Sequence, residues 1–148
     1  MALNVRRVVT ANDANGKAVV WIDDQASNFR SVRPKVNTVL VWSTDSVPAD
    51  LTGDEDLGAR LVARPPERRG TIFRIIEFEP GNTPDMHVTP TIDYAVVMSG
   101  EIDMEVDDGV MVHLKAGDVL VQRATVHNWL NRGTEPCTMA FILIDAQA

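Results

Sequence analysis

The stretch Gly81-NTPDMHVTPTIDYAVVMS-Gly100 places a histidine and an acidic residue beside a run of β-branched residues, between two glycines. Side chains of an extended segment alternate in direction, so His87 and Thr89 point the same way. Asp93 then lies on one face of the strand that follows. This stretch predicts a strand that carries polar side chains toward the interior of the domain.

The segment after Gly100 alternates cleanly between apolar and acidic residues. Ile102 and Met104 fall on one face of the predicted strand, and Asp103 and Glu105 fall on the other. Such a pattern is typical of a strand with one face on the core and one face in water. An Asp-Asp-Gly turn ends the strand, which predicts a hairpin.

The rest of the chain also has the pattern of an all-β protein. Eight prolines and nine glycines are spread through it, and no stretch keeps a helical period between two caps. Short runs of this kind, separated by turns, are typical of a sandwich or barrel. The predicted strands are Arg6 to Ala11, Ala18 to Asp23, Thr38 to Ser43, Thr71 to Phe78, Asp93 to Ser99, Ile102 to Val106, Val110 to Leu114, Asp118 to Gln122, His127 to Asn131 and Cys137 to Ile144.

The segment from Pro48 to Gly70 is the exception. It begins with acidic residues and ends with basic ones, and it contains Pro65-Pro66. We predict a long loop, with one short helix near Asp54 to Leu61. Loops of this length often serve as lids or contact surfaces, and a solvated excursion is the alternative.

A second histidine-bearing stretch, Gly117-DVLVQRATVHNWL-Asn131, completes a resemblance to the cupin superfamily. Gly81, His87 and Gly100 match the first cupin motif, in which Thr89 replaces the second histidine and Asp93 replaces the glutamate. Gly117, His127 and Asn131 match the second motif, which lacks its proline and glycine and is one residue short between Gly117 and His127. The resemblance covers about residues 74–144.

The resemblance implies an all-β, cupin-type double-stranded β-helix, a jelly-roll barrel. We expect one domain over residues 1–148, with N-terminal strands and the long loop in 1–70 and the core barrel in 71–146. An Asp-Tyr pair after the first histidine and a Gln-Arg pair before the second make the chain similar to a group of small single-domain cupins whose reactions are mostly unassigned.

Three side chains form the predicted metal site: His87, Asp93 and His127. Two neutral imidazoles and one carboxylate that converge in a barrel suit Fe(II), and also Mn(II), Ni(II) or Zn(II), and leave positions open for substrate. Asp93 is one methylene shorter than the glutamate of the motif. The alternative is that both histidines are structural, hydrogen-bonded residues of the barrel.

Further residues are candidates for catalysis or substrate binding. Asp93, Tyr94 and Gln122 are the predicted catalytic residues, and Gln122 is an alternative fourth ligand. Arg74 shares a strand face with apolar residues, so it either binds a substrate carboxylate inside the barrel or reaches the rim. Thr89 and Trp129 complete the predicted substrate site. We expect His113 to be an ordinary strand residue and Cys137 to be a core residue.

Composition excludes several classes of function. Apolar residues make up 45% of the chain and charged residues 24%, with a net charge of −7. This charge disfavours nucleic acid as a partner, and no apolar run approaches the about 20 residues that a membrane-spanning helix needs. One cysteine excludes an internal disulfide. The sequence contains no glycine-rich phosphate-binding loop, no dinucleotide-binding fingerprint and no Gly-X-Ser-X-Gly motif of a serine hydrolase. We expect a cytoplasmic protein.

These observations favour a metal-dependent enzyme that acts on a small acid, carbonyl compound or phenol in the barrel mouth. What the resemblance implies is a set of reaction types: dioxygenase, isomerase, decarboxylase or dehydratase. A metal-free dehydratase, a metal-free sensor or binding module, and a structural protein with a filled barrel are the alternatives. We also expect a homodimer, because the strand from Met139 to Ile144 is apolar on both faces.

Overall fold

The computed structural model describes residues 3–62 and 69–147. Apart from one short 3-10 turn, η1 (Asp107–Gly109), the regular elements of this part are β-strands. The strands are β1 (Arg6–Asn12), β2 (Ala18–Gln25), β3 (Asn28–Arg33), β4 (Val36–Thr44), β5 (Thr71–Phe78), β6 (Thr91–Ser99), β7 (Glu101–Glu105), β8 (Met111–Lys115), β9 (Val119–Arg123), β10 (Asn128–Leu130) and β11 (Cys137–Asp145). The all-β prediction is confirmed.

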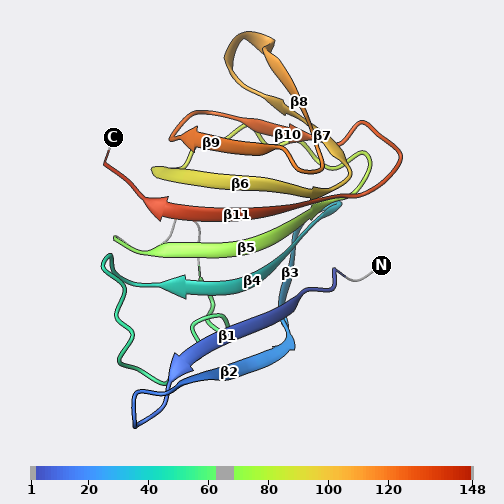
Figure 1. Cartoon of the computed structure of the whole chain (residues 1–148). Helices are drawn as coiled ribbons and strands as arrows, with labels where there is room; N and C mark the ends of the chain where they lie inside the picture. Colours follow the sequence, from blue (N-terminus) through green and yellow to red (C-terminus); the bar gives the residue numbers. More distant parts are fainter. Residues whose placement is uncertain (1–2, 63–68, 148) are drawn as a thin grey trace.

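The strands form two sheets around the core and a separate hairpin. The larger sheet has the order β3-β4-β5-β11-β6-β9, the smaller one has the order β10-β7-β8, and β1 pairs only with β2. Figure 1 shows the strands of the larger sheet side by side, with β7, β8 and β10 at one end and the β1–β2 hairpin at the other. None of the helices in the described residues could cross a membrane.

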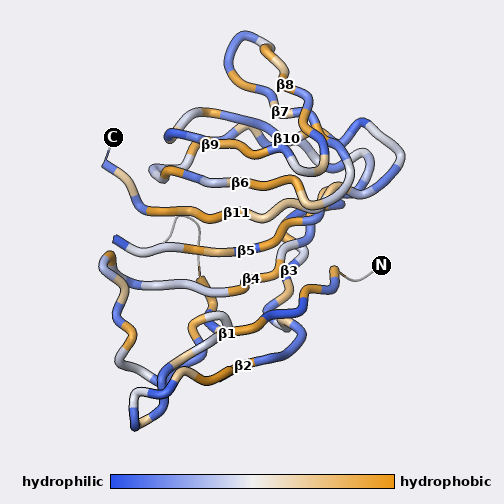
Figure 2. The backbone as a smooth tube through the Cα atoms, viewed as in Figure 1, coloured by the Kyte–Doolittle hydropathy of each residue, from blue (hydrophilic) through white to orange (hydrophobic). Residues whose placement is uncertain are grey.

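Strand alternation decides which side chains build the core. The buried positions of β11 are Cys137, Met139, Phe141 and Leu143, and the positions between them are only half-buried. Figure 2 shows the apolar character of this strand along its length. One face of β11 therefore lies fully in the core. The other face is partly exposed to solvent, and a partner chain that packed on it would bury it.

The outer face of the larger sheet continues this apolar surface beyond β11. Tyr94 and Val96 on β6 are 44% and 40% exposed, and their cross-strand neighbours Val121 and Val119 on β9 are 56% and 72% exposed. The expected homodimer stays a prediction, which the mass of the protein in solution tests.

The N-terminal half contains one strand that the sequence does not predict and lacks one helix that it does. The unpredicted strand is β3. Its cavity-facing residues include Arg30, while the apolar Phe29 is 47% exposed, which is the reverse of the usual pattern. The expected helix near Asp54 to Leu61 is absent, and this segment forms turns. Its backbone is instead held by distant side chains: Asn28 donates to the carbonyl oxygens of Gly58 and Arg60 at 2.9 and 2.6 Å.

A buried arginine ties the β1–β2 hairpin to this segment. The Arg7 side chain is only 6% exposed and donates pairs of hydrogen bonds to Asp24 and Asp56, at 2.8–3.0 Å. The hydrogen bonds from Arg7 hold the pKa of Asp56 below its usual value. Trp21 of β2 also packs edge-on against Trp42 of β4, with ring centroids 5.8 Å apart.

Methionine in place of Arg7 is expected to lower the free energy of unfolding by about 2–3 kcal/mol, because it leaves two carboxylates without their partner. Partial exposure of these carboxylates to water keeps the loss below the about 3–5 kcal/mol that is typical of fully buried pairs. Asp56 has a lowered pKa, so the stabilisation is present above pH 3.8, its ordinary value, and is lost at more acidic pH. Urea unfolding at pH 7 and pH 3 measures both effects.

Arg6→Met is the matched control, because Arg6 forms the same two-bond pair with Asp23 while its side chain is 67% exposed. It should leave the urea midpoint nearly unchanged. Equal losses in the two variants would show that burial of Arg7 does not matter.

Candidate active site

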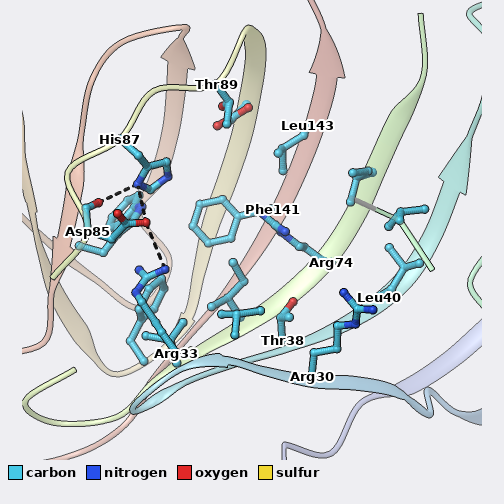
Figure 3. Close-up of a pocket in the computed structure, with 18 of the residues that line it drawn as sticks. Arg30, Arg33, Thr38, Leu40, Arg74, Asp85, His87, Thr89, Phe141 and Leu143 are labelled. Atoms are coloured by element: carbon cyan, nitrogen blue, oxygen red, sulfur yellow. Dashed lines mark hydrogen bonds and ion pairs between the residues drawn. The ribbon is translucent and has the colours of Figure 1, made fainter. Parts of the chain in front are cut away.

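The barrel encloses an open cavity of about 480 Å³. Its walls come from the inner faces of β3, β4, β5 and β11, and its polar residues include both predicted histidines. Figure 3 shows His87 on one side of this space, with Arg74, Thr38 and Arg30 on the other. The side chains of residues 3–62 and 69–147 therefore leave this interior open, which argues against a purely structural role for the domain.

The two histidines meet at one end of the cavity. The backbones of His87 and His127 form an isolated antiparallel bridge, with reciprocal N–H···O=C bonds of 3.0 and 2.9 Å. Their ring centroids lie 4.4 Å apart in an edge-to-face arrangement. The predicted convergence of these imidazoles, from segments 40 residues apart in the chain, is present in the structure.

Backbone carbonyls define the tautomer of both rings. Nδ1 of His87 lies 2.7 Å from the carbonyl oxygen of Asp85, and Nδ1 of His127 lies 2.9 Å from that of Thr125. A carbonyl oxygen only accepts hydrogen bonds, so each Nδ1 carries the proton in the neutral ring. Each Nε2 is then the nitrogen with the lone pair, which can take up a proton or bind a metal ion.

The third predicted ligand, Asp93, is hydrogen-bonded within its own strand. Asp93 is buried, and its Oδ1 accepts a 2.6 Å hydrogen bond from Thr91, which also bonds to Thr89 at 2.8 Å. Within the described residues, no three histidine, cysteine or acidic side chains are grouped so that they could hold a metal ion. His87, Asp93 and His127 all line the same cavity, but among the described residues they are not grouped as a metal site.

The reason lies in the side chains that replace those of the family motif. Thr89 stands where the motif has its second histidine, and a neutral hydroxyl is a poor substitute for an imidazole as a ligand. Asp93 is shorter than the expected glutamate and is held by its neighbour on β6. The donors present therefore do not fit the three-ligand ion that the sequence predicted.

The other predicted site residues divide between the cavity and the outside. Arg74, Thr89 and Trp129 line the cavity, and the Trp129 ring packs edge-on against His127 and Phe141 at centroid distances of 6.1 and 5.6 Å. Gln122 is buried away from the cavity lining and donates to the sulfur of Met104 at 3.2 Å.

Tyr94 lies on the opposite face of β6 from Asp93 and is 44% exposed. The strand alternation that turns Asp93 inward turns its neighbour outward. Tyr94 and Gln122 consequently play no part in the function proposed below.

Sequence reasoning missed six polar residues that line the cavity: Asn28, Arg30, Arg33, Thr38, Arg60 and Asp85. Arg33 pairs with the Asp85 carboxylate at 3.5 Å, and that carboxylate lies 3.4 Å from Nδ1 of His87. The position of Asp85 two residues before His87 was the one available signal. Arg30 and Thr38 are brought to the cavity by strand register, which the sequence pattern does not reveal.

Asn131, which matches the last position of the second motif, is structural. Its buried side-chain amide donates to the carbonyl oxygens of Phe78 and Glu135, both at 2.8 Å, and accepts from the backbone N–H of Gly133. Cys137 is a core residue as predicted, and burial raises the pKa of its thiol to about 12. His113 lies outside the cavity, where a hydrogen bond to Asp103 raises its pKa.

Comparison with known proteins gives matches over most of the chain. A family model described as "Cupin domain" matches residues 74–144. The cupin-domain-containing oxidoreductase fogC of Aspergillus ruber is 33% identical over 147 residues, which cover 95% of this chain and 72% of that protein. Phomopsin biosynthesis cluster protein C' of Diaporthe leptostromiformis is 36% identical over 149 residues, which cover 95% of this chain and 78% of that protein.

A solved structure supports the fold. An RmlC-like cupin from Shewanella frigidimarina matches with a TM-score of 0.53 and 15% identity, over 80% of this chain and 84% of that one. The predicted jelly-roll barrel is confirmed.

Proposed function

Since this chain belongs to the cupin family, we propose that it is an enzyme of the oxidoreductase class that acts on a small organic molecule in the barrel cavity. One observation carries the proposal: two imidazoles with unprotonated Nε2 atoms meet at the end of an open cavity. The relatives that are named cupin-domain-containing oxidoreductases support the class of enzyme.

The step that the residues themselves perform is proton transfer. Nε2 of one histidine removes a proton from a carbon next to a carbonyl group, and the electron pair of the broken C–H bond forms the C=C bond of an enolate. The carbonyls of Asp85 and Thr125 hold each Nδ1–H, so the ring keeps its orientation as Nε2 becomes protonated. Trp129 and Phe141 exclude water beside the imidazoles.

An enolate is a common intermediate of several reactions. Reprotonation at another atom completes an isomerisation, and loss of two electrons to an external acceptor such as molecular oxygen completes an oxidation. The relatives' names favour the second outcome for this chain. The cavity volume suits a molecule of about the size of an aromatic acid.

Proton exchange on phenylpyruvate tests the proposal without knowledge of the natural substrate. This probe combines an apolar ring, a ketone and a carboxylate, and its benzylic protons exchange through the enol. In D2O the protein should speed the loss of the benzylic ¹H NMR signal well beyond the rate with an equal concentration of free imidazole. Binding of the probe with no acceleration would overturn the proposal in favour of a binding module.

A divalent ion, Fe, Mn, Ni or Zn, is the alternative cofactor. The tautomer of the two histidines favours it, because metal-ligating histidines commonly donate Nδ1–H to a backbone carbonyl. The lack of a third protein ligand in the described residues speaks against it.

Elemental analysis of protein from metal-supplemented medium tests this alternative. We expect much less than one ion per chain, with the same content in the His87→Ala variant. A stoichiometric metal that disappears in His87→Ala would establish a metal centre instead.

A further inference from the structure

The cavity has a second polar end, away from the imidazoles. Arg30 on β3, Thr38 on β4 and Arg74 on β5 all line it. Arg30 pairs in register with Thr38, and Arg74 pairs with Leu40, two residues further along the same face of β4. These three side chains therefore share one patch of the larger sheet, whereas β10, next to His127, belongs to the smaller sheet. Figure 3 shows the patch across the cavity from His87.

The hydroxyl of Thr38 lacks a partner that its position requires. Thr38 is only 7% exposed, and its buried Oγ1 makes no hydrogen bond with the described residues. A buried polar atom without a hydrogen bond lowers the stability of the fold by about 1–3 kcal/mol. Such atoms usually have a partner in the functional state. Because Thr38 lines the cavity, a bound molecule can accept a hydrogen bond from it.

The charge around Thr38 selects the kind of molecule. Two carboxylates line the cavity. Asp85 lies in the segment that carries His87, and Asp93 lies on β6, the strand that follows this segment. The patch around Thr38 instead offers two guanidinium groups in a chain with a net charge of −7. A guanidinium has five donors, so it binds a carboxylate while it serves other acceptors.

We propose that Arg30, Thr38 and Arg74 form a binding site for a carboxylate of the substrate. This inference rests on the proposed function and specifies its substrate class: an organic acid whose apolar body spans the cavity. The body lies against Leu40, Ile72 and Phe141, and the carboxylate at one end directs the reacting carbon toward the imidazoles at the other.

Calorimetry with two probes of equal shape tests this site. The wild-type protein should bind 3-phenylpropionate about tenfold or more tightly than 3-phenylpropanamide, its neutral amide, because hydrogen bonds to a charged group are stronger than neutral ones. Arg74→Gln should abolish this preference, Arg30→Gln should reduce it, and Thr38→Val should weaken carboxylate binding several-fold. Arg74→Lys keeps the charge and should retain part of the preference.

Arg123→Gln is the matched control, since it removes the same charge from an exposed position outside the cavity lining. It should bind both probes as the wild type does. Equal binding of the acid and the amide, or a preference that survives in Arg74→Gln, would overturn the carboxylate site and leave the proposed enzyme standing. A preserved acid preference without proton exchange on phenylpyruvate would instead confirm the site and overturn the enzyme.

Discussion

Glutamine in place of His127 is expected to lower the rate of proton exchange on phenylpyruvate by about 100-fold or more, the usual contribution of a positioned general base. His127 is 4% exposed and lies 4.4 Å, between ring centroids, from the other imidazole. Glutamine fills a similar volume but cannot take up a proton near neutral pH. His87→Gln should also lower the rate of proton exchange. The ¹H NMR exchange rate in D2O measures both.

Tyr94→Phe is the control, because Tyr94 lies outside the cavity and should leave the exchange rate unchanged. Each glutamine variant should also keep most of its stability, since the hydrogen bond from Nδ1 to a backbone carbonyl is worth about 1 kcal/mol. Exchange at the wild-type rate in both histidine variants would show that the imidazoles do not transfer the proton.

Alanine in place of Gly100 is expected to lower the free energy of unfolding by about 3–4 kcal/mol, through left-handed backbone strain and a steric collision. Gly100 has a φ of +78°, and a Cβ there would lie 2.4 Å from the carbonyl oxygen of Pro136 and 2.9 Å from Cα of Cys137. Both contacts are with backbone, so no side-chain rotation relieves them. Urea unfolding followed by tryptophan fluorescence measures the loss.

Gly109→Ala separates the two causes. Gly109 also has a positive φ, +70°, but a Cβ at this position meets nothing within 4 Å. It should cost only about 1 kcal/mol of backbone strain. Equal losses in the two variants would show that the collision at Gly100 is relieved by movement of the segment before β11.

The sequence predicted the positions that depend on local pattern. β5 begins and ends at Thr71 and Phe78, as expected from its β-branched run. Motif spacing placed His87 and His127 together, and the structure joins them by an isolated β-bridge outside the named strands. The motif positions Gly100 and Asn131 have structural roles here: one permits a tight turn, and the other bonds three backbone groups.

What the sequence could not predict depends on contacts between distant strands. The carboxylate site needs the register of β3 on β4 and of β4 on β5, which brings Arg30 and Arg74 to the same patch. No local period encodes that register. The described residues contain no group of three metal ligands, and Asp93 instead accepts a hydrogen bond from Thr91 within its own strand, which the motif spacing does not reveal.

The central claim is that His87 and His127 present unprotonated Nε2 atoms to a ligand in the cavity. Two-bond ¹H–¹⁵N NMR on the full chain labelled with ¹⁵N-histidine tests it directly, with His113 as an internal reference outside the cavity. We predict that both rings have Nδ1–H and that their Nε2 signals shift when 3-phenylpropionate saturates the protein, while His113 stays unchanged. Rings protonated at Nε2, or Nε2 signals that ignore the bound acid, would contradict the account.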